Sequence, residues 1–479
     1  MEDGNIRFYV SNQGVLFQQN GNSRFEVPQG SGIHSILASG IWIAGKDGAQ
    51  GKRVSVATYD TSATDFQPGP IDRSTGLPDL PSDWNFVWKT NAGQISNHKT
   101  QYNKIGYQTP WGIQRWPGSN LKQGDFNPIL APFIDLNSNQ LYEPALGETP
   151  YIKGNEASYF ILNDLVTSNR QGSAQGLGVE IYGMVYTEKA FPNVVFVQYQ
   201  IINRSFNQYD SVFVGIFTDF LLGNPFDNYT ATDSARHLLF TYNSLAHDSF
   251  GYGNNPPVMG VKFLRRNLSK SISFNWDLTD HQGWPQNPED YFGYLNAHFK
   301  DGSELTDPVS GQKDYIYLGD PCNGSGWTEY GSSGNVPGRR NMLGSVGPLT
   351  LQRNEVISID LAYIFSRNSS ELLTPICGFY DDADLVQYYW DNTLSAQRPQ
   401  RRSPEILTYP NPAQQTVYWQ LNDNTVIEHV VLMDLNGKQH TLHPEGNRAD
   451  VSAFPAGVYF LILSDIEGTQ YRKRIVIMK

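Results

Sequence analysis

Alternation of apolar and polar side chains with a period of two is the feature that most constrains this chain. One stretch places Val195, Val197, Tyr199 and Ile201 on one face and Gln198 and Gln200 on the other. A later stretch does the same with Ile357, Ile359, Leu361, Tyr363 and Phe365 against Ser358 and Asp360. This period is typical of half-buried β-strands. A short polar break at 206–210 separates the first stretch from another apolar run, 211–220, which predicts an antiparallel hairpin.

The composition agrees with β-structure and bounds the functions. Aromatic residues make up 13% and charged residues 17% of the 479 residues, with 44 Gly and 28 Pro, which favours turn-rich sheets over helix bundles. A chain of this length is expected to form at least two folding units. The formal net charge of -12 argues against nucleic acid as a partner.

Membrane and export segments are not evident in the sequence. No apolar run approaches the length of a transmembrane helix, so we expect no transmembrane segment. The first ten residues, MEDGNIRFYV, contain neither a basic region nor an apolar region of the kind found in signal peptides. We therefore expect that no signal peptide is part of this sequence.

A domain boundary is predicted near residue 400. The segment 381–397 has a helical pattern that starts at Asp382 or Asp384 and includes Leu385, Tyr388 and Tyr389 among its apolar members. The next segment is charged and contains two prolines, which is typical of a linker. We expect a β-rich passenger at 1–396, a linker at 397–405 and a separate unit at 406–479.

The C-terminal unit has its own strand pattern. Residues 430–435 end in Asn436-Gly437, a strong signal for a two-residue hairpin, and 439–442 would form the returning strand. Residues 458–463 and 471–478 predict a second hairpin. Several short strands in a small unit are typical of an immunoglobulin-like sandwich. The predicted fold class is therefore all-β: a large β-sandwich-type passenger, of one or two sandwiches, followed by a small immunoglobulin-like sandwich.

The motifs of this unit resemble a known family. They are the run Tyr409-Pro410-Asn411-Pro412, the central VVLMDLNGK with Asn436 and Gly437, the AGVYFL strand with Gly457 and Tyr459, and the final RKRIVIMK with Lys473 and Lys479. In this order they resemble the type A C-terminal sorting domain of the type IX secretion system of Bacteroidetes. The ordinary alternative is an accessory immunoglobulin-like domain.

The resemblance implies a route and a set of partners. Export would proceed through the periplasm and across the outer membrane by the type IX translocon and its shuttle β-barrel, after which a peptidase removes the sorting domain. The product would be secreted or held at the cell surface, with lipopolysaccharide or polysaccharide as a further partner. A signal peptide is expected to precede the chain.

The passenger resembles a large group of secreted proteins of the same phylum that have no assigned activity, over most of 15–395. The sequence contains no HExxH, GxSxG or phosphate-binding loop motif. We therefore expect an adhesive or carbohydrate-binding module, with a role in gliding motility as one variant. The alternative is an extracellular polysaccharide hydrolase exported by the same route, because paired carboxylates need only be neighbours in space.

One segment has the ligand spacing of a calcium loop. The proposed ligands are side-chain oxygens of Asp135, Asn137, Asn139 and Glu143 and the backbone carbonyl of Leu141. Two departures weaken the pattern: Gln140 stands where a glycine is expected, and Leu146 stands where a bidentate acid is expected. An Asx-rich turn without metal is the alternative.

Three further features leave two readings open. The acidic run with Asp219, Asp227 and Asp233 is either a solvated loop, the reading we favour, or a cation site. Trp84, Trp88, Trp111 and Trp116 would either pack in the core, which is the commoner use of tryptophan, or form a platform on which sugars stack. Cys322 and Cys377 would form either one disulfide or two buried thiols.

Overall fold

The fold is taken from a computed structural model. It describes residues 1–120, 122–332, 335–367, 374–394, 407–420, 427–434, 438–444, 446–465 and 470–479. The chain divides into two compact units, one of Met1–Phe133 with Gln140–Gln397 and one of Ile134–Asn139 with Arg398–Lys479.

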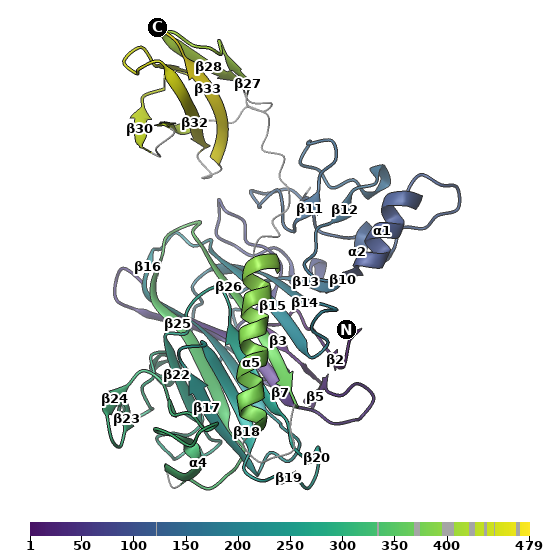
Figure 1. Ribbon diagram of the computed structural model, residues 1–479, viewed down its shortest axis with the longest axis vertical. Coiled ribbons are helices and arrows are strands. Elements are labelled where there is room, and N and C mark those ends of the chain that lie inside the picture. Colours follow the sequence, from purple (N-terminus) through teal and green to yellow (C-terminus); the bar gives the residue numbers. More distant parts are fainter. Residues whose placement is uncertain are drawn as a thin grey trace. The chain divides into compact units, whose positions relative to one another are not determined.

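Two large antiparallel sheets form the first unit (Figure 1). The larger sheet contains, in spatial order, β10 (Trp88–Asn91), β13 (Glu156–Asn163), β14 (Val179–Thr187), β15 (Val194–Asn203), β26 (Val356–Ser366), β21 (Val258–Phe263), β18 (Leu238–Asn243) and β17 (Asn228–Asp233), with β9 (Gln67–Pro68) beside β13. The smaller sheet contains β22 (Lys270–Phe274), β25 (Asn341–Leu351), β16 (Tyr209–Phe220), β7 (Ile36–Lys46) and β3 (Val15–Leu16), with β8 (Lys52–Val56) beside β7.

Short elements complete the first unit. The strands are β1 (Glu2–Asp3), β2 (Ile6–Phe8) and β6 (Phe25–Glu26) in one small sheet, and the ribbons β4 (Gln18–Gln19) with β5 (Asn22–Ser23), β11 (Phe133–Ile134) with β12 (Thr149–Pro150), β19 (His247–Asp248) with β20 (Gly253–Asn254), and β23 (Leu305–Asp307) with β24 (Gly311–Lys313). The helices are α1 (Ala92–Gln101), α2 (Trp111–Gln114), α3 (Pro288–Leu295), α4 (Glu329–Ser332) and α5 (Thr374–Tyr389), with the short turns η1 (Pro81–Asp83), η2 (Pro144–Leu146) and η3 (Trp390–Leu394).

The main core lies between the two large sheets. It contains the predicted inner faces of β15 and β26: Val195, Val197, Tyr199, Ile201, Ile357, Ile359, Leu361, Tyr363 and Phe365 are all at most 4% exposed and belong to one cluster. Buried side chains of β7 and β16 from the smaller sheet join the same cluster. Burial of this continuous apolar surface is the main stabilising term of the passenger. The all-β prediction with a sandwich passenger is confirmed.

The predicted hairpin between β15 and β16 is wrong. β15 pairs with β14 and β26 in the larger sheet, whereas β16 pairs with β7 and β25 in the smaller sheet. The polar break between them carries the chain from one sheet to the other. A strand with alternating side chains can bury its apolar face in either arrangement. The pattern alone therefore does not distinguish a hairpin from a crossing between sheets.

Helices cover the outer faces of both sheets. α3 contacts β7, β8, β16, β22 and β25 of the smaller sheet, and α5 contacts β21 and β26 of the larger one. The buried side of α5 includes Ile376, Phe379, Ala383 and Val386, which cluster with Phe240 of β18 and with other residues of the sheet.

The predicted start of the last helix is corrected by the structure. α5 begins at Thr374, well before Asp382 and Asp384. Leu385 and Tyr388, assigned to the apolar side, are 55% and 68% exposed. The buried stripe starts further upstream, at Ile376, and the sequence pattern was therefore assigned to the wrong face.

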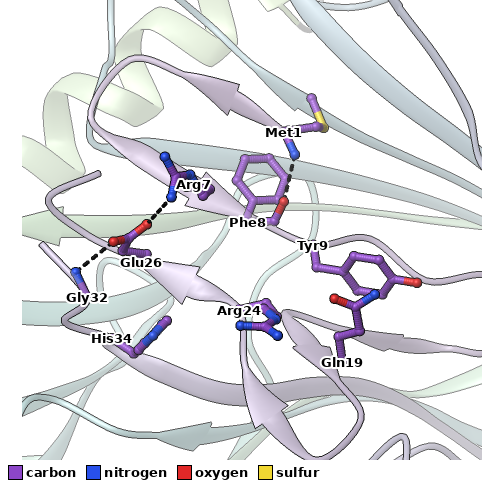
Figure 2. A pocket seen from close by; sticks show the side chains of 9 residues that line it. All are labelled: Met1, Arg7, Phe8, Tyr9, Gln19, Arg24, Glu26, Gly32 and His34. Atoms are coloured by element: carbon purple, nitrogen blue, oxygen red, sulfur yellow. Dashed lines mark hydrogen bonds and ion pairs between the residues drawn. The ribbon is translucent and has the colours of Figure 1, made fainter. Parts of the chain in front are cut away.

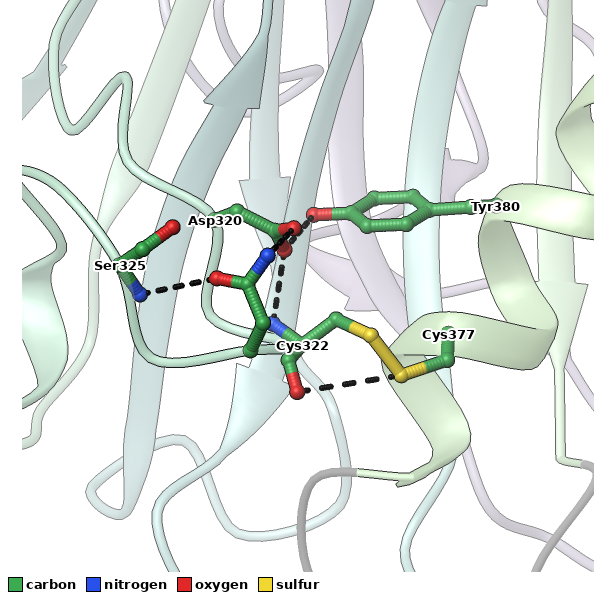
Figure 3. The surroundings of a disulfide bond; sticks show 6 residues. Asp320, Cys322, Ser325, Cys377 and Tyr380 are labelled. Atoms are coloured by element: carbon green, nitrogen blue, oxygen red, sulfur yellow. Dashed lines mark hydrogen bonds between the residues drawn. A yellow bond between two sulfur atoms is a disulfide. The ribbon is translucent and has the colours of Figure 1, made fainter.

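A disulfide joins α5 to a loop of the passenger (Figure 3). Cys377, in the first turns of α5, is bonded to Cys322, and their Cα atoms are 5.3 Å apart. Asp320 organises the loop, because its Oδ1 accepts hydrogen bonds from the Cys322 N–H at 2.8 Å and the Tyr380 hydroxyl at 3.1 Å. The structure thus selects the bridge over two free thiols, and such a bridge is typical of proteins that leave the reducing cytosol.

The C-terminal unit is a small sandwich. One sheet contains β27 (Leu407–Tyr409), β28 (Thr416–Gln420) and β31 (Arg448–Asp450), and the other contains β30 (Gln439–Leu442), β29 (Ile427–Asp434), β32 (Gly457–Asp465) and β33 (Gln470–Ile477). Their facing side chains form a core of its own, which includes Trp419, Leu432, Leu461 and Ile475. The predicted small C-terminal β-domain is confirmed.

Candidate functional sites

The YPNP run of the C-terminal unit is fastened to the edge of the last strand. Pro410 and Pro412 have no N–H to offer to a neighbouring strand. The Asn411 side chain makes the hydrogen bonds to the neighbouring strand instead. Its Oδ1 accepts a hydrogen bond from the Val476 N–H at 2.8 Å, and its Nδ2 donates to the Arg474 carbonyl at 3.2 Å.

Backbone hydrogen bonds between Ala413 and the end of the chain extend the contact that Asn411 makes with β33. The Ala413 N–H donates to the Val476 carbonyl at 2.8 Å, and the Met478 N–H donates to the Ala413 carbonyl at 2.9 Å. The entry segment of the unit therefore covers the edge of β33 that β32 leaves open. Covering this edge satisfies backbone groups that would otherwise be available to another strand.

The other predicted sorting residues have varied surroundings. Tyr409 is 52% exposed and stacks on Tyr418, with ring centroids 5.6 Å apart. Tyr459 is buried and its hydroxyl donates to the Pro455 carbonyl at 3.1 Å. Gly457 begins β32, Lys473 lies half-buried on β33, and Lys479 is exposed. Asn436 and Gly437 lie outside the described residues.

The predicted calcium ligands fall in two units. Asp135 Oδ1 accepts a hydrogen bond from the Ser138 N–H at 2.7 Å, and Asn137 Oδ1 accepts one from the Asn139 N–H at 3.1 Å. Gln140 has a φ of 63°, so it adopts the left-handed conformation for which a glycine was expected. Leu141 and Glu143 belong to the first unit, in which the Glu143 N–H donates to the Glu148 carboxylate at 2.7 Å.

These contacts leave calcium as a prediction. Within the described ranges no group of three or more His, Cys, Asp or Glu side chains is arranged to hold a metal ion. The predicted calcium loop would instead use amide and backbone oxygens beside its two carboxylates. Oxygen ligands of this kind suit a hard cation, and the Asx turns orient the two side chains of Asp135 and Asn137.

The three acidic residues of the run 219–233 have different partners. Asp219 is fully buried and forms hydrogen bonds with Arg339 and with the Tyr59 hydroxyl. Asp233 pairs with Arg236 at 2.8 Å. Asp227 accepts a hydrogen bond from the Asn243 amide at 2.8 Å, and burial, followed by the neighbouring Asp248, raises its pKa to about 6. The favoured reading of a solvated loop is therefore wrong, because Asp219 and Asp233 lie on β16 and β17. Arg339 and Arg236 balance these two carboxylates, and we assign the run a structural role.

Three of the four clustered tryptophans pack in the core. Trp84, Trp88 and Trp116 are at most 7% exposed and belong to the second core cluster, on the outer side of the larger sheet. Trp111 is 48% exposed, and its ring centroid lies 5.7 Å from that of Phe86, which is 43% exposed. The core interpretation of the group is therefore correct for all members except Trp111.

A pocket of about 400 Å³ lies beside the small sheet at the start of the chain (Figure 2). Arg7, Glu26 and His34 line up across neighbouring strands, with Arg7 opposite Glu26 and Glu26 opposite His34. The Glu26 carboxylate accepts hydrogen bonds from Gly32 N–H at 2.7 Å and pairs with Arg7 at 3.1 Å. Although burial opposes it, these contacts hold the pKa of Glu26 below its usual range.

A second pocket of about 210 Å³ adjoins the first, because Phe8 and Tyr9 line both. Its other side consists of Val87, Lys89 and Ser158, of which Lys89 and Ser158 are paired residues of β10 and β13. We call the two adjoining pockets together the Tyr9 groove.

Asn12 holds the two sides of the Tyr9 groove together. Its buried side-chain amide donates to Asn85 Oδ1 at 3.0 Å and lies 3.4 Å from the Phe86 carbonyl. The exposed Phe86 directly precedes Val87 of the second pocket in the chain, and its ring contacts that of Trp111.

The sequence did not reveal the Tyr9 groove. Its residues come from 1–34, 87–89 and 158, and none of these stretches contains a recognisable motif. The only available signal was the exposed member of the tryptophan group, which lies near one end of the groove.

Comparisons with known proteins identify the C-terminal unit. Residues 407–478 match the family model described as a secretion system C-terminal sorting domain. Among solved structures, a polysaccharide lyase is matched with a TM-score of 0.21 and 9% identity, over 64% of this chain and 36% of that protein. A similarity of this size carries no conclusion about the passenger. No curated protein matches the sequence.

No helix among the described residues has both the length and the apolar character needed to cross a bilayer. The matched range 407–478 covers all the strands of the C-terminal sandwich, from β27 to β33. The chain therefore carries a C-terminal sorting domain at 407–478 and is a type IX secretion cargo protein, directed to the cell surface or the extracellular space.

Proposed function

We propose that the passenger is a carbohydrate-binding adhesive module and that the Tyr9 groove is its binding site. The observation that carries the proposal is the union of two pockets along Tyr9, which gives an elongated, partly aromatic surface. Sugar rings present apolar C–H faces that pack on aromatic rings, and their hydroxyl groups need hydrogen-bond partners. Tyr9 supplies the ring, and Gln19 and Ser158 supply polar groups along the same surface.

The composition of the groove favours binding over hydrolysis. Glycoside hydrolysis requires two carboxylates on either side of the scissile bond. Among the residues that line the two pockets, Glu26 is the one carboxylate, and it already interacts with Arg7 and Gly32. An exported polysaccharide hydrolase, the alternative from the sequence, receives no support from this site. Adhesion to a polysaccharide would also serve gliding motility.

A pair of matched tyrosine variants tests the site. The full-length chain is screened on a glycan array, and the affinity for the best glycan is measured by calorimetry for Tyr9→Ala and Tyr102→Ala. Both tyrosines are 37% exposed, but Tyr102 lines neither pocket. We expect Tyr9→Ala to abolish measurable binding and Tyr102→Ala to retain it. Equal affinities for all three proteins would refute the assignment of the groove, and absence of any glycan ligand would refute the proposed function.

We also propose which partners the protein meets during export, on the basis of its sorting domain. The partners are the outer-membrane translocon with its shuttle β-barrel and a peptidase that cuts after the passenger, with surface lipopolysaccharide as the attachment point when the product is retained. The sorting domain at 407–478 supports this set of partners. Deletion of 403–479 should leave the passenger in the periplasm of an expressing cell. Unchanged amounts of passenger outside the cell would refute the role of this unit.

We also propose that the loop from Asp135 to Glu143 binds calcium. The left-handed Gln140 and the Asx turns of Asp135 and Asn137 support a loop with oxygens presented in sequence. Calcium would stabilise the fold locally.

A further inference from the structure

We propose that the ligand of the Tyr9 groove is an acidic polysaccharide, with its anionic group bound between Arg24 and His34. This inference rests on the proposed carbohydrate-binding function and specifies the class of glycan. The anionic group is a carboxylate, as in uronic acids, or a sulfate ester. Both present several oxygens to a guanidinium group.

Arg24 is the cation that this pocket leaves unbalanced. Arg7 and Glu26 pair with each other across the small sheet at 3.1 Å. Arg24 lines the same pocket and is exposed, and no described carboxylate lies within ion-pair distance of its guanidinium. The pocket therefore carries a net positive charge on a chain whose formal charge is -12. A local charge opposite to that of the whole molecule selects for an anionic partner.

His34 adds a second hydrogen-bonding side chain to the lining of the same pocket. Its Nδ1 is buried and has no hydrogen-bond partner among the described residues. Burial lowers the pKa of His34, so the ring is neutral at pH 7 and can donate a hydrogen bond from one nitrogen. Because Nδ1 itself is inaccessible to solvent, the ring would donate to a bound anion from its other nitrogen, Nε2. Figure 2 shows the His34 and Arg24 side chains on the same side of the pocket.

Tyr9 is placed to hold a sugar ring next to this anion site. The Tyr9 N–H donates to the Arg24 carbonyl at 3.0 Å, so the two residues are neighbours just beyond the paired strands β2 and β6. Gln19 lines the pocket with them (Figure 2). A uronic acid residue stacked on Tyr9 would place its carboxylate toward Arg24 and a hydroxyl group toward the Gln19 amide. The groove continues past Tyr9 toward Lys89, which provides space for further sugar residues.

The test measures the affinity of the full-length chain for three defined probes by calorimetry. They are an oligogalacturonate, a sulfated carrageenan oligosaccharide and a neutral cello-oligosaccharide of similar length. We expect one anionic probe to bind and the neutral probe not to bind, and the anionic probe that binds identifies the group. Tight binding of the neutral probe alone would overturn the anionic assignment while leaving carbohydrate binding intact. Binding of none of the three, together with an empty glycan array, would instead refute the proposed function.

Arginine variants show whether the anion is bound at this place. Arg24→Ala should weaken binding of the anionic probe roughly tenfold or more, because a charge-assisted hydrogen bond is lost. Arg24→Lys should restore part of the affinity, since it keeps the charge but not the fork of donors. Arg115→Ala serves as the control, since Arg115 is exposed and lines neither pocket. An equal loss in Arg24→Ala and Arg115→Ala would mean general attraction by surface charge and would overturn the site.

Discussion

The Asn411 side chain hydrogen-bonds the backbone at Val476 as a strand would, with Oδ1 2.8 Å from the Val476 nitrogen. Two prolines flank Asn411, so the backbone on either side of it has no N–H to offer. The side-chain amide supplies both the acceptor and the donor that the edge of β33 requires. The YPNP run therefore has a structural role in the sorting domain, because it holds the entry segment against the edge of β33.

Replacement of Asn411 should loosen the last strand. In Asn411→Ala the Val476 N–H and the Arg474 carbonyl lose their partners, and we expect the free energy of unfolding of the sorting domain to fall by about 1–2 kcal/mol. Hydrogen exchange of the Val476 amide should accelerate. Asn411→Asp keeps the acceptor alone and should have a smaller effect on that amide. Asn447→Ala, an exposed asparagine of the same unit, is the control. Unchanged exchange at Val476 in Asn411→Ala would contradict the fastening.

Loss of the disulfide should destabilise the passenger. The bridge between Cys322 and Cys377 closes a loop with a sequence separation of 55. A closed loop of this length restricts the unfolded chain, and its removal is expected to cost about 4 kcal/mol. We expect the double variant Cys322→Ser/Cys377→Ser to unfold at a lower urea concentration than the oxidised protein. A reducing agent should shift the native protein in the same direction and leave the double variant unchanged. Coincident urea curves for the oxidised protein and the double variant would refute this role.

Lys262 should make stability rise with pH. It is 2% exposed on β21, and its Nζ donates to the Arg236 carbonyl at 2.6 Å. Burial is the largest effect and lowers the pKa of Lys262 to about 8. The carboxylates of Asp384, Asp233 and Asp391 raise the pKa in partial compensation, whereas the Arg236 guanidinium lowers it. Between about pH 8 and the ordinary pKa of lysine, the unfolded chain binds more protons than the native one. The free energy of unfolding therefore increases with pH in this window.

The Lys262→Met variant isolates this effect from other titrations. We expect the free energy of unfolding of the native protein, relative to Lys262→Met, to rise by about 2 kcal/mol between pH 7 and pH 9.5. Chemical denaturation at several pH values measures it. Lys99→Met, at an exposed lysine of α1, should give a curve parallel to that of the native protein. Parallel curves for the native protein and Lys262→Met would show that the lysine is not perturbed.

The sequence predicted the inner faces of the strands but not what covers the outer ones. Ile357 and Leu361 alternate with polar residues, and their burial follows from the pattern. Ala362 and Ile364 on the opposite face of β26 are buried under α5, which the helical pattern placed too late in the chain. Alternation reports one buried face, whereas the helix that covers the second face is set by tertiary packing.

The residues of the sorting motifs are close together in the sequence, whereas those of the Tyr9 groove are far apart. The YPNP run and the strands of the C-terminal unit lie within about 75 residues, so a local pattern was sufficient to identify them. Arg24, Tyr9 and Lys89 come from separate stretches of the chain, and the fold brings them to the two adjoining pockets. No spacing rule connects them, and the groove became evident from the structure alone.

Calcium should raise the melting temperature if the loop from Asp135 to Glu143 binds it. A ligand present at a hundred times its dissociation constant adds about 2.7 kcal/mol to the free energy of unfolding. We expect a higher melting temperature with millimolar calcium than with a chelator, and a smaller difference with magnesium, which demands stricter octahedral geometry. Asp135→Ala should abolish the response. Asp47→Ala removes a comparable Asx turn, at Ala49 and Gly51, and should retain it. A melting temperature that does not change at saturating calcium would eliminate the site, and an equal loss of response in both variants would place the bound ion elsewhere.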